Sequence, residues 1–267
     1  MLSLFQNTFV ETLGRLTMRL MRETGTFARF VLQSWGRSLS PPWNIRLILD
    51  QMGAIGVNSL PIALLTSIFV GLVMVLQMGW QLIKFGSKNY VPGISFIANA
   101  RELVPVFTAF VVGARVASSI AAELGTMRVT EQIDAMDILN VDPMRYLVAP
   151  RVIAATVMLP IISALCLLGG FFGGMAVAAG PLNISPAEYY IITTKFAYLE
   201  DVFSGLFKTI VFGNVIALVG CYFGYSTRGG AEGVGRATTT AVVITLLLIL
   251  VWDFLLTQGI LLVMGRL

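Results

Sequence analysis

The feature that most constrains this chain is a series of apolar runs, each long enough to cross a lipid bilayer as a helix. A helix rises ~1.5 Å per residue, so about 20 apolar residues span the ~30 Å hydrocarbon core. Five runs reach this length, at residues 53–83, 97–120, 147–180, 201–225 and 238–264. Only 12% of the residues are charged, which leaves too little polar surface to cover a soluble core. The sequence therefore predicts an all-α integral membrane protein, with residues 1–267 forming a single domain of five transmembrane helices.

The segment before the first run, residues 1–50, combines apolar residues at helical spacing with many arginines. Trp35 and Trp43 are typical of a membrane interface. The sequence SLSPPWN, residues 38–44, is expected to end the helix because proline cannot continue the helical hydrogen bonding. We therefore predict an interfacial elbow helix on the membrane surface. The alternative is a basic tail in solution, which would leave the apolar stripe exposed to water.

The placement of lysine and arginine predicts how the helices are oriented. Cytoplasmic loops carry an excess of these residues. Most of them precede the first run, flank residues 121–143 or lie between the fourth and fifth runs, whereas the other side holds only Lys84, Lys88, Lys195 and Arg266. We therefore expect the N-terminus in the cytoplasm and the C-terminus on the opposite face of the membrane.

The residue types present argue against several kinds of chemistry. The chain contains no histidine, the commonest general base and a frequent metal ligand. We therefore expect neither a catalytic site nor a metal site. No G-x-x-x-x-G-K-[ST] motif occurs, so we expect no nucleotide and no other cofactor in this chain. No nucleic acid is expected as a partner.

A polar segment, AAELGTMRVTEQIDAMDILNVDP (residues 121–143), interrupts the apolar runs. On a helical wheel Ile133 and Met136 share one side, whereas Glu131 and Asp134 share another. We therefore expect an amphipathic helix between two spans. Its apolar stripe either folds back on loops of the same chain or enters a groove on a soluble partner, and composition alone does not separate these two interpretations.

The sequence around this segment resembles the MlaE/YrbE family of permeases. The resemblance runs through NARELVPVFTAFVVGARVASSIAAELG, ELGTMRVTEQIDAM and DPMRYLVAPRVIA, within residues 99–154, and extends over nearly the whole chain. It implies the homodimeric permease subunit of an ABC transporter that moves phospholipid between the inner and outer membranes of Gram-negative bacteria and maintains outer-membrane lipid asymmetry. It also implies a multi-pass protein of the bacterial inner membrane, with its N-terminus cytoplasmic and its C-terminus periplasmic.

The resemblance implies a set of partners as well. Residues 121–143 would form a cytoplasmic coupling helix that docks on a separate MlaF-like ABC ATPase, which binds ATP and Mg²⁺, accompanied by an MlaB-like STAS-domain protein. An MlaD-like ring of MCE domains would meet the periplasmic side, where residues 181–200 are expected to form a loop or short helix. The coupling residues that the resemblance implies are Glu123, Leu124, Gly125, Thr126, Met127, Glu131, Gln132 and Asp134.

Ionisable side chains interrupt the apolar runs at Arg101, Glu102, Lys208 and Asp253. Each would cost roughly 2.5–3.5 kcal/mol at the centre of a membrane helix, so each must pair or face water. Counting residues from the ends of the runs places all four in the outer half of the membrane. We hypothesise an outward-facing cavity for a phospholipid headgroup, in which Arg101 and Lys208 supply positive charge. The alternative is snorkelling together with a purely structural pair between Lys208 and Asp253.

A second candidate lipid-binding surface lies on the first run. Met74, Met78, Leu82 and Phe85 are spaced to share one helical face. Methionine is an adaptable apolar residue, suited to varied acyl chains. Ordinary helix packing is the alternative, but the resemblance favours lipid binding, because the first span lines the lipid pocket in that family.

Two other functions compete with an ABC permease. An ion- or proton-coupled secondary transporter would use Glu102 and Asp253 as carriers, although the sequence contains no convincing inverted repeat. A non-transporting scaffold of a membrane complex is the third interpretation.

Overall fold

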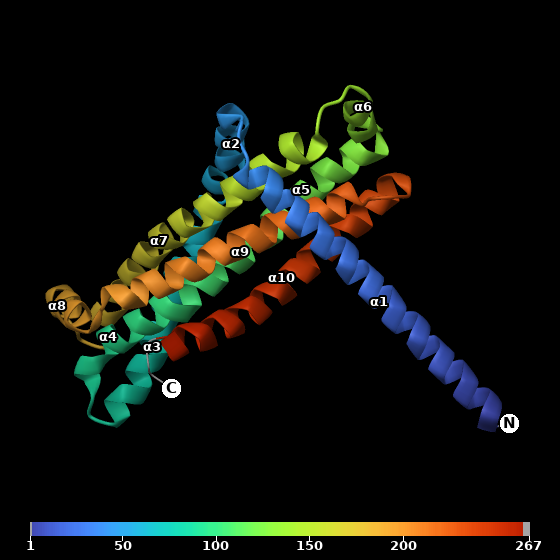
Figure 1. Cartoon of the computed structure of the whole chain (residues 1–267). Helices are drawn as coiled ribbons and strands as arrows, with labels where there is room; N and C mark the ends of the chain where they lie inside the picture. Colours follow the sequence, from blue (N-terminus) through green and yellow to red (C-terminus); the bar gives the residue numbers. More distant parts are fainter. Residues whose placement is uncertain (1, 264–267) are drawn as a thin grey trace.

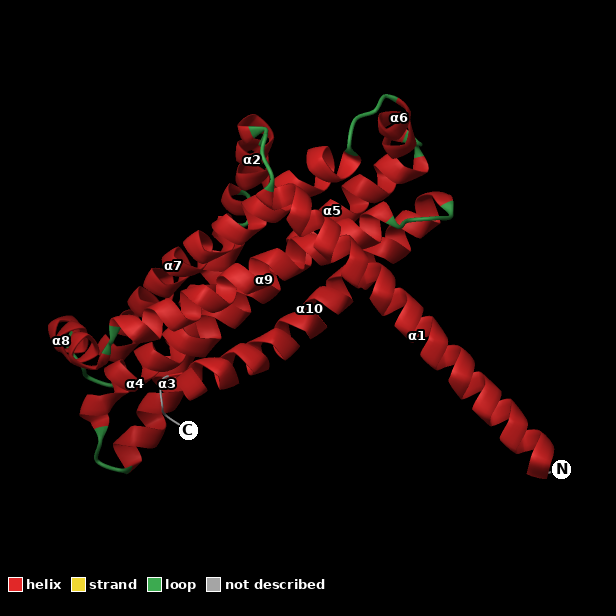
Figure 2. Cartoon of the chain, viewed as in Figure 1, coloured by secondary structure: helices red, strands yellow, loops and turns green. Residues whose placement is uncertain are grey.

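The computed structural model describes the backbone of residues 2–263 and the side chains of residues 17, 18 and 21–262. Within that part of the chain all regular structure is helical, which confirms the predicted all-α class (Figure 2). Five helical stretches are long and apolar enough to cross a membrane, as predicted; they are Ile45–Lys84, Lys88–Val129, Met144–Ala179, Leu199–Tyr225 and Gly230–Leu262.

The α-helices are separated in places by single turns of π-helix or 3₁₀-helix. The α-helices are α1 (Leu2–Leu39), α2 (Ile45–Met52), α3 (Leu60–Lys84), α4 (Val91–Ala98), α5 (Val104–Val129), α6 (Gln132–Ile138), α7 (Ala149–Ala179), α8 (Pro186–Phe196), α9 (Leu199–Tyr225) and α10 (Gly230–Val263). The π turns are Gly53–Val57, Asn99–Leu103 and Met144–Val148, and the 3₁₀ turn is Lys88–Tyr90.

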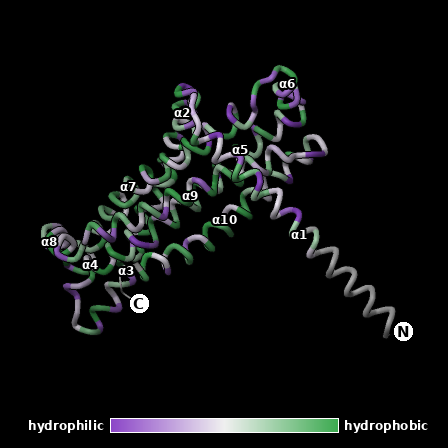
Figure 3. The backbone as a smooth tube through the Cα atoms, in the orientation of Figure 1, coloured by the Kyte–Doolittle hydropathy of each residue, from purple (hydrophilic) through white to green (hydrophobic). Residues whose placement is uncertain are grey.

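Five long helices, α3, α5, α7, α9 and α10, form one elongated bundle (Figure 1). The short helices α2 and α6 lie at one end of this bundle, which we call the α6 end, and α4 and α8 lie at the other, the α8 end (Figure 1). Hydrophobic segments run along the bundle, whereas hydrophilic segments gather around α2 and α6 (Figure 3). This distribution matches a bundle embedded in lipid along its length and in contact with water at its ends.

Two of the long helices extend beyond the apolar runs that predicted them. At the α6 end, α5 continues past residue 120 to Val129, and α10 begins at Gly230, eight residues before its apolar run. Hydropathy marks only the part of a helix that lies in hydrocarbon, whereas backbone hydrogen bonding continues a helix into water.

The segment predicted as one coupling helix, residues 121–143, is not a single helix. Its first third is the end of α5, and only Gln132–Ile138 forms the separate helix α6. Glu131 separates the two because its φ of 60° is left-handed, a conformation that cannot continue a right-handed helix. The side chain of Arg128 pairs with Asp134 across this break. The predicted helix boundaries were therefore wrong, and the coupling role of this segment stays a prediction.

The first helix joins the bundle through its C-terminal part. The ring of Phe30 is buried against Tyr222 and Tyr225, and Trp35 Nε1 donates a hydrogen bond of 3.1 Å to Asn214 Oδ1. The N-terminal part of α1 projects away from the bundle (Figure 1). The helix ends at Leu39, inside the segment where proline was expected to end it. The side chains of residues 2–16, which carry much of the expected apolar stripe, lie outside the described residues.

At the opposite end, residues 181–200 contain the short helix α8, as expected from the sequence. The Ser185 hydroxyl caps it by accepting a hydrogen bond of 3.2 Å from the Glu188 backbone N–H. The ring of Tyr189 is buried beside Phe171, and this burial raises the pKa of its hydroxyl to about 12. This helix is therefore fixed to the bundle rather than free.

Glycine faces let the long helices approach one another closely. A Cβ added to Gly71 would lie 2.0 Å from the Gly170 carbonyl oxygen, so α3 and α7 touch backbone to backbone. The same holds where Gly213 of α9 meets the Ala155 carbonyl of α7, at 2.4 Å from the added Cβ. Small residues on facing helices are the usual way in which membrane helices gain packing contacts.

We predict that Gly71→Ala forces α3 and α7 apart and lowers stability by about 2–3 kcal/mol, the upper range for overpacking. The measurement is the thermal unfolding midpoint of the detergent-purified protein. Gly235→Ala is the matched control, because nothing lies within 4 Å of an added Cβ there and alanine is the better helix former. Equal midpoints for the two variants would contradict the close backbone contact.

Candidate functional site

The candidate site is built around the π turn Asn99–Leu103, which carries Arg101 and Glu102. The backbone N–H of Val104 bonds to the carbonyl of Asn99, and Pro105 has no N–H with which to continue the normal α-helical ladder. Gly205 of α9 lies against this turn, since an added Cβ there would be 2.0 Å from the Ala100 carbonyl oxygen. Single π turns inside helices are frequent at functional sites, and this one brings two charged side chains against α9.

Lys208 of α9 is the centre of the charge cluster. Its side chain is only 2% exposed, and its Nζ lies 2.6 Å from Glu102 Oε2 and 3.0 Å from Asp253 Oδ1. It also donates a hydrogen bond of 2.7 Å to Thr257 Oγ1. A lysine ammonium has three N–H donors, so all of them are used. The pair between Lys208 and Asp253 that was one alternative is present, and Glu102 belongs to the same cluster.

Arg101 pairs with a residue that the sequence analysis did not single out. Its Nε donates a hydrogen bond of 2.6 Å to Asp201 Oδ1, and its Nη2 contacts the same oxygen. The Asp201 side chain is 1% exposed, whereas that of Arg101 is 27% exposed. Asp201 lies in the first turn of α9, where an acidic residue is a common helix-start signal. Because of that ordinary explanation, the sequence did not indicate that Asp201 pairs with Arg101.

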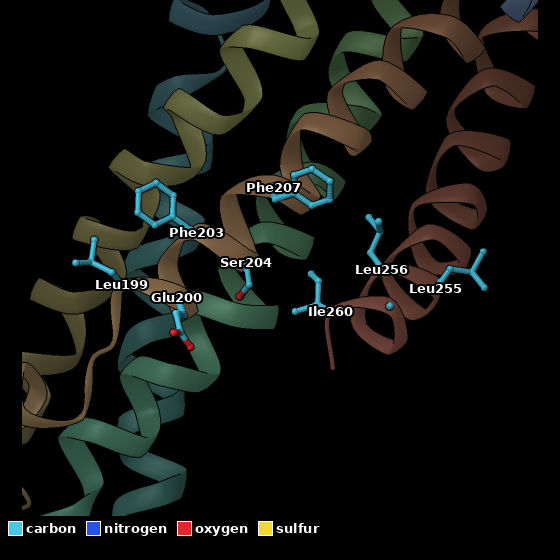
Figure 4. A pocket seen from close by; sticks show the side chains of 9 residues that line it. Leu199, Glu200, Phe203, Ser204, Phe207, Leu255, Leu256 and Ile260 are labelled. Atoms are coloured by element: carbon cyan, nitrogen blue, oxygen red, sulfur yellow. The ribbon is translucent and has the colours of Figure 1, made fainter. Parts of the chain in front are cut away.

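Two cavities adjoin at this cluster. The first, about 270 Å³, is lined by Arg101, Glu102, Ser204, Lys208, Thr257, Ile260 and Leu261. The second, about 660 Å³, lies between α9 and α10 and shares Ser204 and Ile260 with the first. Figure 4 shows the second cavity, with Phe203 and Phe207 of α9 on one side and Leu255 and Leu256 of α10 on the other. The charged cavity and the apolar cavity are therefore neighbours that share two lining residues.

The four residues predicted on the first span do not line this pair of cavities. Met74 lines a separate groove of about 510 Å³ with Leu103 and Phe107, and Leu82 packs against the small core around Tyr189. Met78 is half-buried on α3. Phe85 follows the last residue of the helix and is 80% exposed, so it is not on the shared helical face. The rotation of α3 is set by its glycine contacts with α7, which spacing alone does not reveal.

The apolar lining residues of the α9–α10 cavity were missed by the sequence analysis. Phe203 and Phe207 are spaced i, i+4 on α9, as are Leu256 and Ile260 on α10. Such pairs share a helix face, but similar pairs occur throughout an apolar chain. Only their position beside Lys208 and Asp253 distinguishes them.

At the α6 end, an ion pair joins the coupling segment to α7. Glu123 Oε1 lies 2.7 Å from Arg151 Nη2, and Arg151 also donates a hydrogen bond of 2.6 Å to the Leu147 carbonyl. The side chain of Arg151 is 4% exposed and that of Glu123 is 52% exposed. The guanidinium of Arg128 lies 5.8 Å from the ring centroid of Tyr225 at the end of α9. Helices α5, α7 and α9 are thus connected near α6.

The predicted coupling residues divide into buried and exposed groups. Leu124 and Gly125 are buried inside the bundle, and an added Cβ on Gly125 would meet the Thr227 hydroxyl at 3.0 Å. These two residues therefore pack against α9 and α10 rather than facing a partner, and Met127 is half-buried. The exposed members are Glu123, Thr126, Glu131, Gln132 and Asp134. Two apolar residues that were not predicted, Ile138 and Leu139, are 85% and 74% exposed at the end of α6.

These features define the class of the protein. A bundle of five membrane-length helices, with a cluster of ion pairs and neighbouring polar and apolar cavities between the helices, is typical of a multi-pass membrane transport protein. The chain belongs to the MlaE permease family, because residues 48–259 match the family described as "Permease MlaE". It is therefore a permease subunit of the ABC-transporter class, which implies an ATPase partner.

Relatives agree with this assignment. A probable ABC transporter permease protein of Synechocystis is 46% identical over 80% of this chain and 81% of its own length. One from Rickettsia typhi is 41% identical over 92% of this chain and 95% of its own length. The protein TRIGALACTOSYLDIACYLGLYCEROL 1, chloroplastic, of Arabidopsis thaliana is 38% identical over 80% of this chain and 61% of its own length.

We predict that Lys208→Met destabilises the protein by about 3 kcal/mol, because it leaves two carboxylates facing each other without their cation. The estimate is at the low end for a broken buried pair, since Glu102 is 40% exposed. Thermal unfolding in detergent measures the loss. Adding Asp253→Asn to Lys208→Met should recover part of it by removing the like-charge repulsion. A double variant no more stable than Lys208→Met would contradict this account of the cluster.

Proposed function

We propose that this permease moves phospholipid between the inner and outer membranes of a Gram-negative bacterium and thereby maintains outer-membrane lipid asymmetry. The observation that carries the proposal is that a charged cavity and an apolar cavity lie next to each other and share Ser204 and Ile260 as lining residues. A phospholipid has the same division, with a charged headgroup joined to apolar chains. An ion or a small polar solute would make no favourable contacts in the larger apolar cavity between α9 and α10.

The name of the Arabidopsis relative supports a lipid substrate. That name contains trigalactosyldiacylglycerol, a glycolipid with two acyl chains. The headgroup differs from a phospholipid headgroup, but the diacylglycerol part is shared. An apolar cavity of about 660 Å³, lined by phenylalanine and leucine, suits that shared part.

The energy for transport would come from a separate ATPase, which would bind the ATP and Mg²⁺. The chain has no nucleotide-binding motif. The exposed apolar residues Ile138, at the end of α6, and Leu139, directly after it, would enter a groove on the ATPase. A movement of α6 would displace α5, which precedes it in the chain. The ion pair between Glu123 of α5 and Arg151 of α7 would transmit the displacement to α7. Two packed helices joined in this way move as bodies.

The orientation and the assembly follow from the same proposal. The α6 end would face the cytoplasm and the α8 end the periplasm of the bacterial inner membrane. The permease would act as a homodimer, with an MlaF-like ATPase and an MlaB-like STAS-domain protein on the cytoplasmic side and an MlaD-like MCE ring on the periplasmic side. Much of α10 has exposed apolar side chains, such as Leu247, Leu250 and Phe254, which either lipid or a second copy would cover.

Reconstitution tests the proposal. The complex purified in mild detergent should contain a nucleotide-binding subunit, and in vesicles it should move labelled phospholipid to acceptor membranes only when ATP is hydrolysed. Lipid movement driven by a pH gradient without nucleotide would instead indicate a secondary transporter that uses Glu102 and Asp253. A stable complex with no lipid movement under either condition would indicate a scaffold.

We predict that the double substitution Ile138→Asp and Leu139→Asp abolishes co-purification of the ATPase, because it places two charges on the proposed docking surface. Both side chains are exposed in the permease, so its own thermal midpoint should hardly change. The matched control is Tyr190→Asp, an exposed aromatic on α8 at the opposite end of the bundle. Retention of the ATPase by the double variant would show that α6 is not the docking element.

A further inference from the structure

We propose that the charged cavity selects zwitterionic aminophospholipids, those that carry a phosphate and a primary ammonium, over anionic phospholipids. This inference rests on the proposed function and names the headgroup that the same site takes. It follows from which charged groups of the cluster still have free hydrogen-bonding capacity and from the sum of their formal charges.

Lys208 does not bind the headgroup. All three N–H donors of its ammonium are taken by Glu102, Asp253 and Thr257, and the side chain is 2% exposed. The positive charge that Lys208 was predicted to supply to a phosphate would therefore act through the electric field of the cavity and not through a hydrogen bond. The role of Lys208 is to hold α9 against α10 and the π turn.

Arg101 is the one cation of the cluster that can still donate. Its Nε and Nη2 contact Asp201, whereas its Nη1 makes no hydrogen bond among the described residues. The side chain lines the charged cavity and is 27% exposed. The free edge of a guanidinium is a good donor to phosphate oxygens. Arg101 therefore receives the phosphate.

Glu102 is the open acceptor beside it. One of its oxygens accepts a hydrogen bond from Lys208 and the other accepts one from Thr257. A carboxylate offers about four lone-pair sites, so roughly two remain, and the side chain is 40% exposed in the same cavity. A carboxylate with free acceptor sites is matched by an ammonium with N–H donors. The adjacent Arg101 and Glu102 therefore match an adjacent phosphate and ammonium on one ligand.

The total charge of the cluster favours the same ligand. Two cations, Arg101 and Lys208, face three carboxylates, Glu102, Asp201 and Asp253, which leaves one formal negative charge. A headgroup with a net negative charge is repelled by this field, whereas a headgroup with no net charge is not.

The test is headgroup competition on the complex purified from the membrane. It is incubated with vesicles that contain equal amounts of phosphatidylethanolamine and phosphatidylglycerol with identical acyl chains, then re-isolated, and the retained lipids are counted by mass spectrometry. We expect about fivefold enrichment of phosphatidylethanolamine, a modest value for one charge-assisted hydrogen bond at a partly exposed carboxylate. Phosphatidylcholine, whose quaternary ammonium has no N–H, should be enriched less.

Two variants assign the selectivity to residues. Glu102→Gln should bring the ratio of the two lipids close to that of the vesicles while total lipid per complex is kept. Arg101→Gln should lower the retention of both lipids. Glu188→Gln is the control, because Glu188 is an exposed carboxylate on α8 outside both cavities.

The failure of this inference is distinguishable from the failure of the proposed function. Lipid retained by the wild-type complex in the ratio of the vesicles overturns the headgroup selectivity and leaves lipid transport standing. An enrichment that survives Glu102→Gln overturns the role of Glu102. No retained lipid at all contradicts both proposals. If Glu102→Gln fails to fold, the ratio of phosphatidylethanolamine to phosphatidylglycerol on the wild-type complex still tests the headgroup selectivity.

Discussion

The structure depends on one buried ammonium. Lys208 sits in the bundle where α9, α10 and the π turn before α5 meet, and a charge at that depth is tolerated only because two carboxylates and a hydroxyl surround it. Removing Lys208 would leave the Glu102 and Asp253 carboxylates without their cation, and the contacts of Lys208 hold the three segments in one arrangement. The charged cavity and the apolar cavity both lie beside this cluster and share Ser204 and Ile260 as lining residues.

The same helix connects the lipid cavity to the coupling segment. The π turn with Glu102 leads directly into α5, which runs for 26 residues to Val129. At ~1.5 Å per residue this is roughly 39 Å of continuous helix. At its far end Glu123 is paired with Arg151 and Arg128 lies over the Tyr225 ring. In the proposed mechanism, a displacement at α6 would therefore reach Glu102 through one stiff element, while α7 and α9 are attached to it.

The sequence predicted where the membrane helices lie along the chain better than it predicted how each helix is rotated about its axis. Hydropathy located five spans because the bilayer requires long apolar helices, and the free-energy cost of charges in a membrane singled out Arg101, Glu102, Lys208 and Asp253 from the sequence alone. The partner of Arg101 was not predictable, since Asp201 in a first helical turn has an ordinary explanation. The positions of Met74 and Met78 were not predictable either, because the backbone contact at Gly71 decides which face of α3 meets α7. The left-handed Glu131, which ends α5, has no sequence signal of the usual kind, since glycine or asparagine normally takes that conformation.

The central claim is that a phospholipid occupies the cavity between α9 and α10 with its headgroup at the Lys208 cluster. The most direct measurement is photo-crosslinking of the membrane-embedded complex with a phospholipid that carries a photoreactive group in its acyl chain, followed by mapping of the adducts by mass spectrometry. The account predicts adducts concentrated on residues lining that cavity, such as Phe203, Phe207 and Leu256. Adducts spread evenly over every exposed apolar helix face, with no excess at the cavity, would contradict it.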